Sequence, residues 1–399
     1  SPERGMDLMK RGGQGHDTLG RLLAELCNTP GRKRGALQLE AAMAGAALKE
    51  YVEQEGRILV GEAFTRFMND LYTRVFGMIN SHDPGEKVGG VLAIDALIDV
   101  SLVGENATKI ARFANYLRDV FQPSTDYTTM VLSARALGHL VRTGGPMTAD
   151  VVTFEVRRAL EWLRGDRVES RRFAAVHLLR ELANNAPTVF NVHVSQFIVS
   201  IWSALRDPKL IVRETAVGAL RACLVVVEKR ETRYRVKWYY ELFEETKRGA
   251  RKSAGADSIH GSLLALGELL RHTGEFMLAR YREVVDMVLQ YCKSRDKLVR
   301  QSVANLIPKL AHFAPERFAK TYLGPVMQYL LAAIRSPTER GIGFKSLGNL
   351  AIAFKKVRSP AVASIEAQLP LVANLIQEAI SVKRGKPVCP EAIEAAGAL

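Results

Sequence analysis

The sequence predicts an all-α fold, an α-solenoid in which antiparallel helix pairs stack in series. Helical periodicity runs through nearly the whole chain, and short turns rich in Asp and Pro interrupt it at nearly constant intervals. Alternating β-branched runs of strand length are absent. Each helix pair exposes too much apolar surface to be stable alone, so we expect neighbouring pairs to bury that surface against one another.

The clearest repeat unit surrounds the Asp207-Pro208 step. Apolar residues follow this step on one face of a helix, at Val212, Ala216, Ala219, Leu220, Cys223, Leu224 and Val227. An equivalent face precedes it, formed by Phe190, Val194, Phe197, Ile198, Ile201, Trp202 and Leu205. We expect Asp207 to cap the second helix and Pro208 to lie in its first turn. Two helices around an Asp-Pro turn, with Arg213 one turn into the second helix, resemble a HEAT repeat.

Turn signals of this kind recur along the chain and define the predicted repeats. After an Asn28-Thr29-Pro30 turn they lie at Asp83, Asp126, Asp166, Asp207, Asp257, Asp296 and Ser336. The steps between these seven anchors are 43, 40, 41, 50, 39 and 40 residues, and HEAT-type repeats run at roughly 40–47 residues. Each anchor precedes an apolar-periodic segment, such as KVGGVLAIDALI, TMVLSARALGHL, RRFAAVHLLREL, IHGSLLALGELL, VRQSVANLIPKL and FKSLGNLAIAF.

These observations predict a loose lead-in over residues 1–17 and a HEAT solenoid over residues 18–399. We expect a right-handed superhelix of about eight helix pairs. The last residues, CPEAIEAAGAL, look like a further helix that is truncated at the C-terminus.

Composition limits the possible classes of function. The 399 residues carry a net charge of +14, which suits nucleic acid, an acidic membrane surface or an acidic protein partner, but this charge is spread along the chain. The four cysteines, at positions 27, 223, 292 and 389, form no CxxC pair, so we expect neither a disulfide framework nor structural zinc. We find no apolar run that approaches the roughly 18 residues of a membrane span, and expect no membrane insertion.

The sequence does not support a catalytic, cofactor-binding or metal site in this chain. In Gly341–Ser346, Phe344 separates Gly343 from Lys345, and no strand precedes the segment, so helix packing is favoured over a phosphate-binding loop. Ala314-Pro315-Glu316 matches a short kinase motif without its companion motifs and instead predicts the start of a helix. The eight histidines form no metal-ligating pattern. We therefore do not expect this chain to be an enzyme by itself.

Two features are candidates for a structural or binding role. The first is a ladder of turn aspartates and second-helix arginines, with Asp207, Arg213, Asp296 and Arg300, which we expect to bond along the stack of repeats. The second is the basic and aromatic segment from Arg230 to Lys252, in the one lengthened repeat. We expect Arg248, Arg251 and Lys252 to form a partner-binding rim. The alternative interpretation of this segment is an amphipathic helix with Trp238 and Phe243 packed inward.

Several stretches are similar to a known family. They are KVGGVLAIDALI, GENATKIARFANYLRDVF, FEVRRALEWLRGDRVESRRFAAVHLLRELANNAPTVF, RDPKLIVRETAVGALRACL, KWYYELFEETKRGA and DSIHGSLLALGELLR. They resemble the N-terminal HEAT region of the target of rapamycin (TOR) serine/threonine kinases, which belong to the phosphatidylinositol-3-kinase-related family. The resemblance runs from about Leu37 to Phe354 and is most specific from Val88 to Arg271.

The resemblance implies a scaffolding arm of a protein kinase complex in nutrient and growth signalling. The implied partners are a Raptor-like subunit, a second TOR protomer and a Rheb-like GTPase, in the cytoplasm and at the vacuolar or lysosomal membrane surface. The kinase segments of the family have no counterpart here, so no catalytic residue is carried over. Two alternatives share the architecture, a karyopherin-like transport receptor and a HEAT-like nucleic-acid glycosylase. A transport receptor that binds basic cargo is usually acidic, whereas this chain is basic; we expect no nucleic acid partner.

Overall fold

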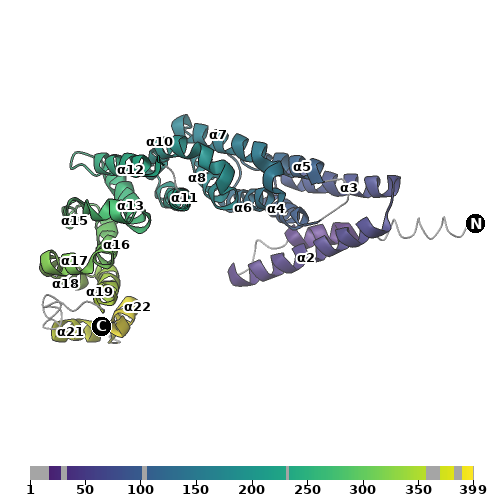
Figure 1. Cartoon of the computed structure of the whole chain (residues 1–399). Helices are drawn as coiled ribbons and strands as arrows, with labels where there is room; N and C mark the ends of the chain where they lie inside the picture. The colour runs from purple at the N-terminus through teal and green to yellow at the C-terminus, as the bar shows by residue number, and fades with distance from the viewer. Residues whose placement is uncertain are drawn as a thin grey trace, which may run out of the picture. The chain divides into compact units, whose positions relative to one another are not determined.

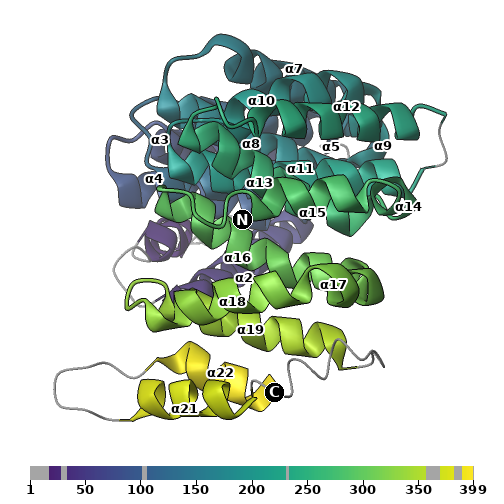
Figure 2. The same cartoon turned by 90° about the vertical axis from the view of Figure 1, so that its left-hand side faces the viewer.

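The computed structural model describes residues 18–27, 34–100, 106–230, 233–355, 369–381 and 389–398. Every regular element within these ranges is a helix (Figures 1 and 2), which confirms the all-α prediction. The expected lead-in over residues 1–17 and the Asn28-Thr29-Pro30 turn lie outside the described residues.

The chain divides into two compact units, Ser1–Ala204 and Leu205–Leu399. The division falls at the end of α10 (Val194–Leu205) and before α11 (Leu210–Glu228). The two helices of the hairpin around Asp207 therefore belong to different units, which the sequence pattern did not indicate.

Unit 1 consists of two rows of helices. One row contains α2 (Arg34–Ile58), α4 (Pro84–Ile98), α6 (Tyr127–Gly144) and α8 (Glu169–Asn185), in which each helix packs on the next. The other row contains α3 (Glu62–Ile79), α5 (Asn106–Asp119) and α7 (Ala149–Gly165), followed by the short α9 (Pro187–Phe190) and by α10. Figure 1 shows α3, α5 and α7 along one side of this unit, and α4, α6 and α8 along the other. This is the arrangement that stacked helix pairs produce.

Unit 2 repeats the arrangement. Its first row contains α11, α13 (Ala256–His272), α16 (Lys297–Phe313), α19 (Arg340–Phe354) and α22 (Pro390–Ala398), packed in that order from α11 to α22. The helices of its second row are α12 (Arg235–Gly249), α14 (Glu275–Leu278), α15 (Tyr281–Leu289), α17 (Pro315–Thr321), α18 (Leu323–Arg335) and α21 (Leu369–Ile380). In Figure 1 the first row descends from α13 to α22, with α15, α17 and α18 beside it.

The predicted turn chemistry holds at some anchors and fails at others. Asp83, Asp126 and Asp296 are N-caps, and each carboxylate accepts a hydrogen bond from the backbone N–H three residues later. Asp207 is not a cap, because α11 begins at Leu210, and its carboxylate accepts instead from the Lys209 N–H at 2.9 Å. Pro208 therefore lies in the turn and not in the helix. Asp257, expected in a turn, lies in the first turn of α13.

The predicted apolar faces form the core. All seven residues of the face that starts at Val212 are buried, and so are all seven of the face that starts at Phe190. The second face is not one continuous α-helix, however, since residues Asn191–His193 form a 3-10 turn between α9 and α10. Gly343 lies in α19 and is packed between helices, as expected from the sequence. A Cβ at this position would lie 2.9 Å from a side-chain carbon of Ile334, which is too close.

The apolar run Pro187–Leu205 corrects one expectation. At 19 residues it is long and apolar enough to cross a membrane by length and composition, whereas the sequence analysis found no such run. Over half of it, 56%, is buried inside the protein, as is usual for a core helix. Polar side chains such as Ser195 and Gln196 interrupt it away from the apolar face.

Glycine allows a close helix crossing at the start of unit 2. A Cβ at Gly261 in α13 would lie 1.6 Å from the carbonyl oxygen of Leu205, which no side chain can tolerate. The backbone of α13 therefore lies directly against the turn that precedes α11. This contact brings the first turn of α13 next to Arg213 and sets the geometry of the ladder described below.

Candidate protein-binding surface

Arginines of the second helices bond to the turns that precede them. In three repeats an arginine donates to the carbonyl oxygens six and five residues earlier: Arg172 to Asp166 and Arg167, Arg213 to Asp207 and Pro208, and Arg300 to Ser294 and Arg295. Arg340 donates to the carbonyl oxygen of Ile334, again six residues earlier. Ser294, and not Asp296, thus occupies the position that corresponds to Asp207.

The Arg213 guanidinium also reaches the next repeat. Its side chain is only 2% exposed, and Nη1 lies 2.6 Å from a carboxylate oxygen of Asp257 in α13. Nε donates to Nδ1 of His260 at 3.2 Å. Burial, and then the nearby Arg213, lower the pKa of His260 to about 4, so this ring is neutral near pH 7 and can accept the hydrogen bond. The contact joins α11 to α13.

Arg300 makes a similar contact one repeat further along. Its Nε pairs with the carboxylate of Glu339, just before α19, while Asp296 caps α16 through the N–H of Val299. Arg213 and Arg300 thus bond to the same type of turn, and their carboxylate partners in the next repeat are Asp257 and Glu339, not the predicted Asp207 and Asp296. Glu339 and His260 were not predicted from the sequence; the six-residue spacing from turn to arginine is the signal that could have located the arginines.

The predicted rim lies at the end of α12 and in the turn after it. Arg248 is exposed and pairs with Glu245 at 2.7 Å, while Arg251 and Lys252 are exposed and form no ion pair within the described residues. Trp238 and Phe243 are buried, as the amphipathic alternative required. One face of this helix packs into the unit and the exposed cations lie away from it, as the amphipathic interpretation requires. The partner-binding role of the rim stays a prediction.

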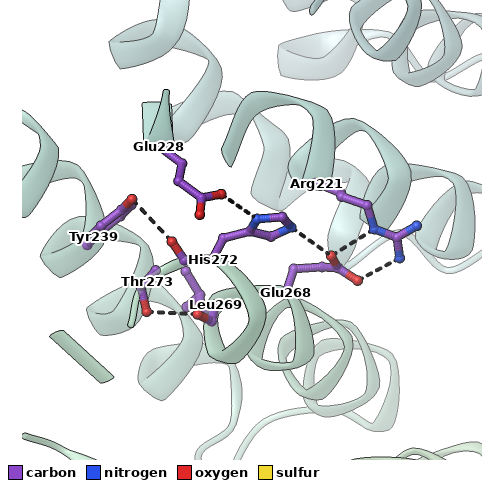
Figure 3. A network of polar contacts seen from close by, with 7 residues as sticks. All are labelled: Arg221, Glu228, Tyr239, Glu268, Leu269, His272 and Thr273. Carbon is purple, nitrogen blue, oxygen red and sulfur yellow. Dashed lines mark hydrogen bonds and ion pairs between the residues drawn. The ribbon is translucent and has the colours of Figure 1, made fainter. Parts of the chain in front are cut away.

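A polar network joins α11, α12 and α13 beside this segment (Figure 3). Arg221 donates two hydrogen bonds to the buried carboxylate of Glu268, at 2.8 and 2.7 Å. Burial alone would raise the pKa of Glu268, but the hydrogen bonds from Arg221 hold it below its ordinary value, so the carboxylate stays charged. His272 lies between Glu268 and Glu228, with Nδ1 3.0 Å from Glu228, and Tyr239 donates to the His272 carbonyl at 3.3 Å.

Unit 1 carries a groove of about 850 Å³ between α2, α4 and α6. Its floor is apolar, with Val88, Leu92 and Ala96 among the lining residues. His139 of α6 bridges Asp95 of α4 and Asp99, the C-cap of that helix, at 2.9 and 3.0 Å. The groove is lined by both acidic and basic residues, so its charge selects no class of partner.

Comparisons with solved structures define the class of this protein. The karyopherin Kap121p has a TM-score of 0.57 and 12% identity, over 95% of this chain and 37% of that one. Kap121p bound to Nup53p has a TM-score of 0.56 at the same identity, over 95% of this chain and 41% of that one. At this identity the likeness shows the fold alone. The chain is an all-α solenoid of HEAT-type helix pairs.

Sequence comparisons give the family. The chain is 49% identical over 386 residues to the serine/threonine-protein kinase TOR of Arabidopsis thaliana, which covers 97% of this chain and 15% of that protein. It is 51% identical over 357 residues to the TOR kinase of Oryza sativa subsp. japonica, over 90% of this chain and 14% of that one. The kinase tor1 of Schizosaccharomyces pombe is 40% identical over 345 residues, which cover 86% of this chain and 14% of that protein.

The chain belongs to the family of the TOR serine/threonine-protein kinases, and the predicted resemblance is confirmed. It spans about 15% of the length of the relatives it matches. No protein-family model matches the chain. The karyopherin alternative described a fold that this chain shares, whereas the relatives found by sequence are TOR kinases.

Proposed function

We propose that this chain is the N-terminal scaffolding arm of a TOR-type serine/threonine kinase. The observation that carries the proposal is that almost the whole chain matches TOR kinases while its described residues form stacked helix pairs. Such a stack offers a long surface to protein partners. Catalysis is then assigned to parts of the kinase outside this chain, and the arm has no cofactor.

The proposed partners are a Raptor-like subunit, a second TOR protomer and a Rheb-like GTPase. Two solved structures support the general idea that a fold of this type binds proteins, since Kap121p was crystallised with Nup53p and with RanGTP. We further propose a cytoplasmic location, with peripheral association at the vacuolar or lysosomal surface. Imaging of a fluorescent fusion would test that location, and a nuclear or secreted signal would contradict it.

We propose the rim of Arg248, Arg251 and Lys252 as a contact for the Raptor-like subunit. All three are exposed cations at one end of α12, in the lengthened repeat, and two of them have no carboxylate partner within the described residues. Exposed charges at the edge of an interface mainly set association rate and specificity, and salt screens them over roughly 8 Å at physiological ionic strength. The rim is therefore expected to act through the rate of association.

Surface plasmon resonance at two salt concentrations tests this contact. The variant Arg248→Glu, Arg251→Glu, Lys252→Glu should associate with a Raptor-like subunit about tenfold more slowly at low salt. Its rate should also depend less steeply on salt than that of the wild type. Circular dichroism and melting should be unchanged, because the three side chains are exposed.

A matched control reverses three other exposed lysines of unit 2, Lys293, Lys297 and Lys320. It changes the net charge equally and should keep the wild-type rate if the contact is local. Wild-type association of the rim variant would reject the rim but leave the arm in place. No association of the wild-type chain with any of the three proposed partners would instead reject the scaffold proposal.

A further inference from the structure

Three cations from neighbouring helices of the first row of unit 2 lie close enough to Glu268 or to one another to interact electrostatically. Arg221 of α11 bonds to the Glu268 carboxylate and is still 48% exposed. Arg271 lies three residues after Glu268, on the same helix α13. Lys309 of α16 places its ammonium over α13, because a Cβ at Gly267 would lie 3.2 Å from its Nζ. We call Arg221, Arg271 and Lys309 the cation cluster.

The cluster carries more positive than negative charge. Glu268 is its central carboxylate and is already occupied by two hydrogen bonds from Arg221. Neither Arg271 nor Lys309 forms an ion pair within the described residues, although both are exposed. The pKa of Lys309 is below its ordinary value, first because the surrounding protein partly desolvates the ammonium, although the side chain as a whole is exposed, and also because Arg221 and Arg271 repel it, against the attraction of Glu268. An added anion would relieve that repulsion.

Each cation suits a carboxylate ligand. The guanidinium of Arg271 offers paired N–H donors that match the two oxygens of a carboxylate, and Lys309 offers a compact charge. Gly267 has no side chain, so Lys309 and Leu306 of α16 pack close to the backbone of α13, which fixes the Lys309 ammonium over that helix. Asn305, exposed one turn before Lys309 on α16, adds an amide that can bond to a peptide backbone.

We propose that the cation cluster on α11, α13 and α16 binds an acidic, extended segment of a protein partner, through Asp or Glu side chains that reach Arg271 and Lys309. This surface is separate from the α12 rim. The inference holds for the chain by itself, whether or not a Raptor-like subunit binds at that rim.

Charge complementarity favours an acidic protein over nucleic acid as the occupant. A nucleic-acid surface generally needs cations spaced along a phosphate backbone, often with exposed aromatic rings for base stacking. Here the cations are compact, the buried carboxylate of Glu268 lies among them, and no large exposed aromatic side chain is found on α11, α13 or α16 within the described residues. A short run of separated carboxylates fits this arrangement better.

Fluorescence anisotropy with a labelled peptide of alternating Glu and Ser tests the proposal at low ionic strength. The variant Arg271→Gln, Lys309→Gln should bind about five- to tenfold more weakly than the wild type, because it removes two exposed ion pairs with the peptide. The single reversal Lys309→Glu should weaken binding at least as much. Both variants should fold normally, because both side chains are exposed and neither forms an ion pair within the part of the chain that the structure describes.

Two controls make the result decisive. The variant Lys293→Gln, Lys320→Gln removes the same charge from elsewhere on unit 2 and should bind like the wild type, and a peptide with Gln in place of Glu should not bind. Equal binding by the cluster variant and this control would overturn the proposal. The proposal would also be overturned if a uridine oligonucleotide bound the wild type more tightly than the acidic peptide does and the cluster variant abolished that binding. The surface would then bind nucleic acid. Loss of rim-dependent binding alone would leave this inference intact.

Discussion

Arg213 and Arg248 show how the interior and the surface of unit 2 use the same side chain. Arg213 is 2% exposed and bonds to a carboxylate, an imidazole and two carbonyl oxygens. Arg248 is 63% exposed and has one carboxylate partner on its own helix. A buried guanidinium must be fully bonded, because an unpaired buried charge is costly, whereas an exposed one is solvated and stays available to a partner. Burial, and not residue type, separates the structural cations from the candidate binding cations.

The largest effect is expected from a charge in the interior. Leu220→Asp places a carboxylate among the buried residues of α11 and should lower the free energy of unfolding by more than about 4 kcal/mol. Hydrogen exchange should show fast amides in α11 and in α13, on which it packs. The matched control Ile211→Asp, on an exposed position of the same helix, should cost less than about 1 kcal/mol. Similar losses in both variants would contradict the assigned apolar face.

The arginine comparison can be tested directly. Arg213→Met leaves Asp257, His260 and two carbonyl groups without their donor and should cost about 3 kcal/mol in a urea unfolding experiment. Arg248→Met removes a single exposed pair and should cost less than about 1 kcal/mol. Equal losses of stability in the two variants would contradict the assignment of Arg213 as a structural arginine and of Arg248 as one that is free to bind a partner.

A smaller effect is expected from the pH dependence of His260. The folded protein keeps this ring neutral down to about pH 4, whereas the unfolded chain protonates it near pH 6.5. Between these values the unfolded state binds more protons, so stability rises with pH and falls on acidification. The contribution of His260 should be complete above about pH 6.5 and about 2 kcal/mol smaller at pH 5.

Urea unfolding of the wild type and of His260→Asn at pH 7 and pH 5 isolates this contribution. The asparagine carbonyl can still accept from Arg213 but does not titrate, so the variant should lose less stability on acidification. Some dependence should remain, because burial also lowers the pKa of His177, to about 3. An unchanged pH dependence in the variant would contradict a lowered pKa of His260 in the folded protein.

Local pattern predicted much of this fold. The offsets at Val212, Leu220 and Val227 could only be those of a helix, and all three side chains are buried. The cap at Asp296 was also predictable, because a carboxylate there reaches an N–H within its own turn. The cap predicted at Asp207 does not form, since α11 starts two residues later than the Asp-Pro step suggested. The division at Leu205 left no mark on the periodic pattern at all.

The sequence by itself determined the all-α class, the repeat spacing and the faces that enter the core, because helix period and turn chemistry are local properties of the chain. The TOR family could also be recognised from it. Only the tertiary structure decided which cations are buried in structural contacts and which are exposed and can bind a partner. Asp257, Glu268 and Gly267 lie some 40 residues from the cations they meet, at Arg213, Arg221 and Lys309. Their pairing depends on how one repeat is set against the next, and side-chain packing between helices, which no local pattern encodes, fixes that register.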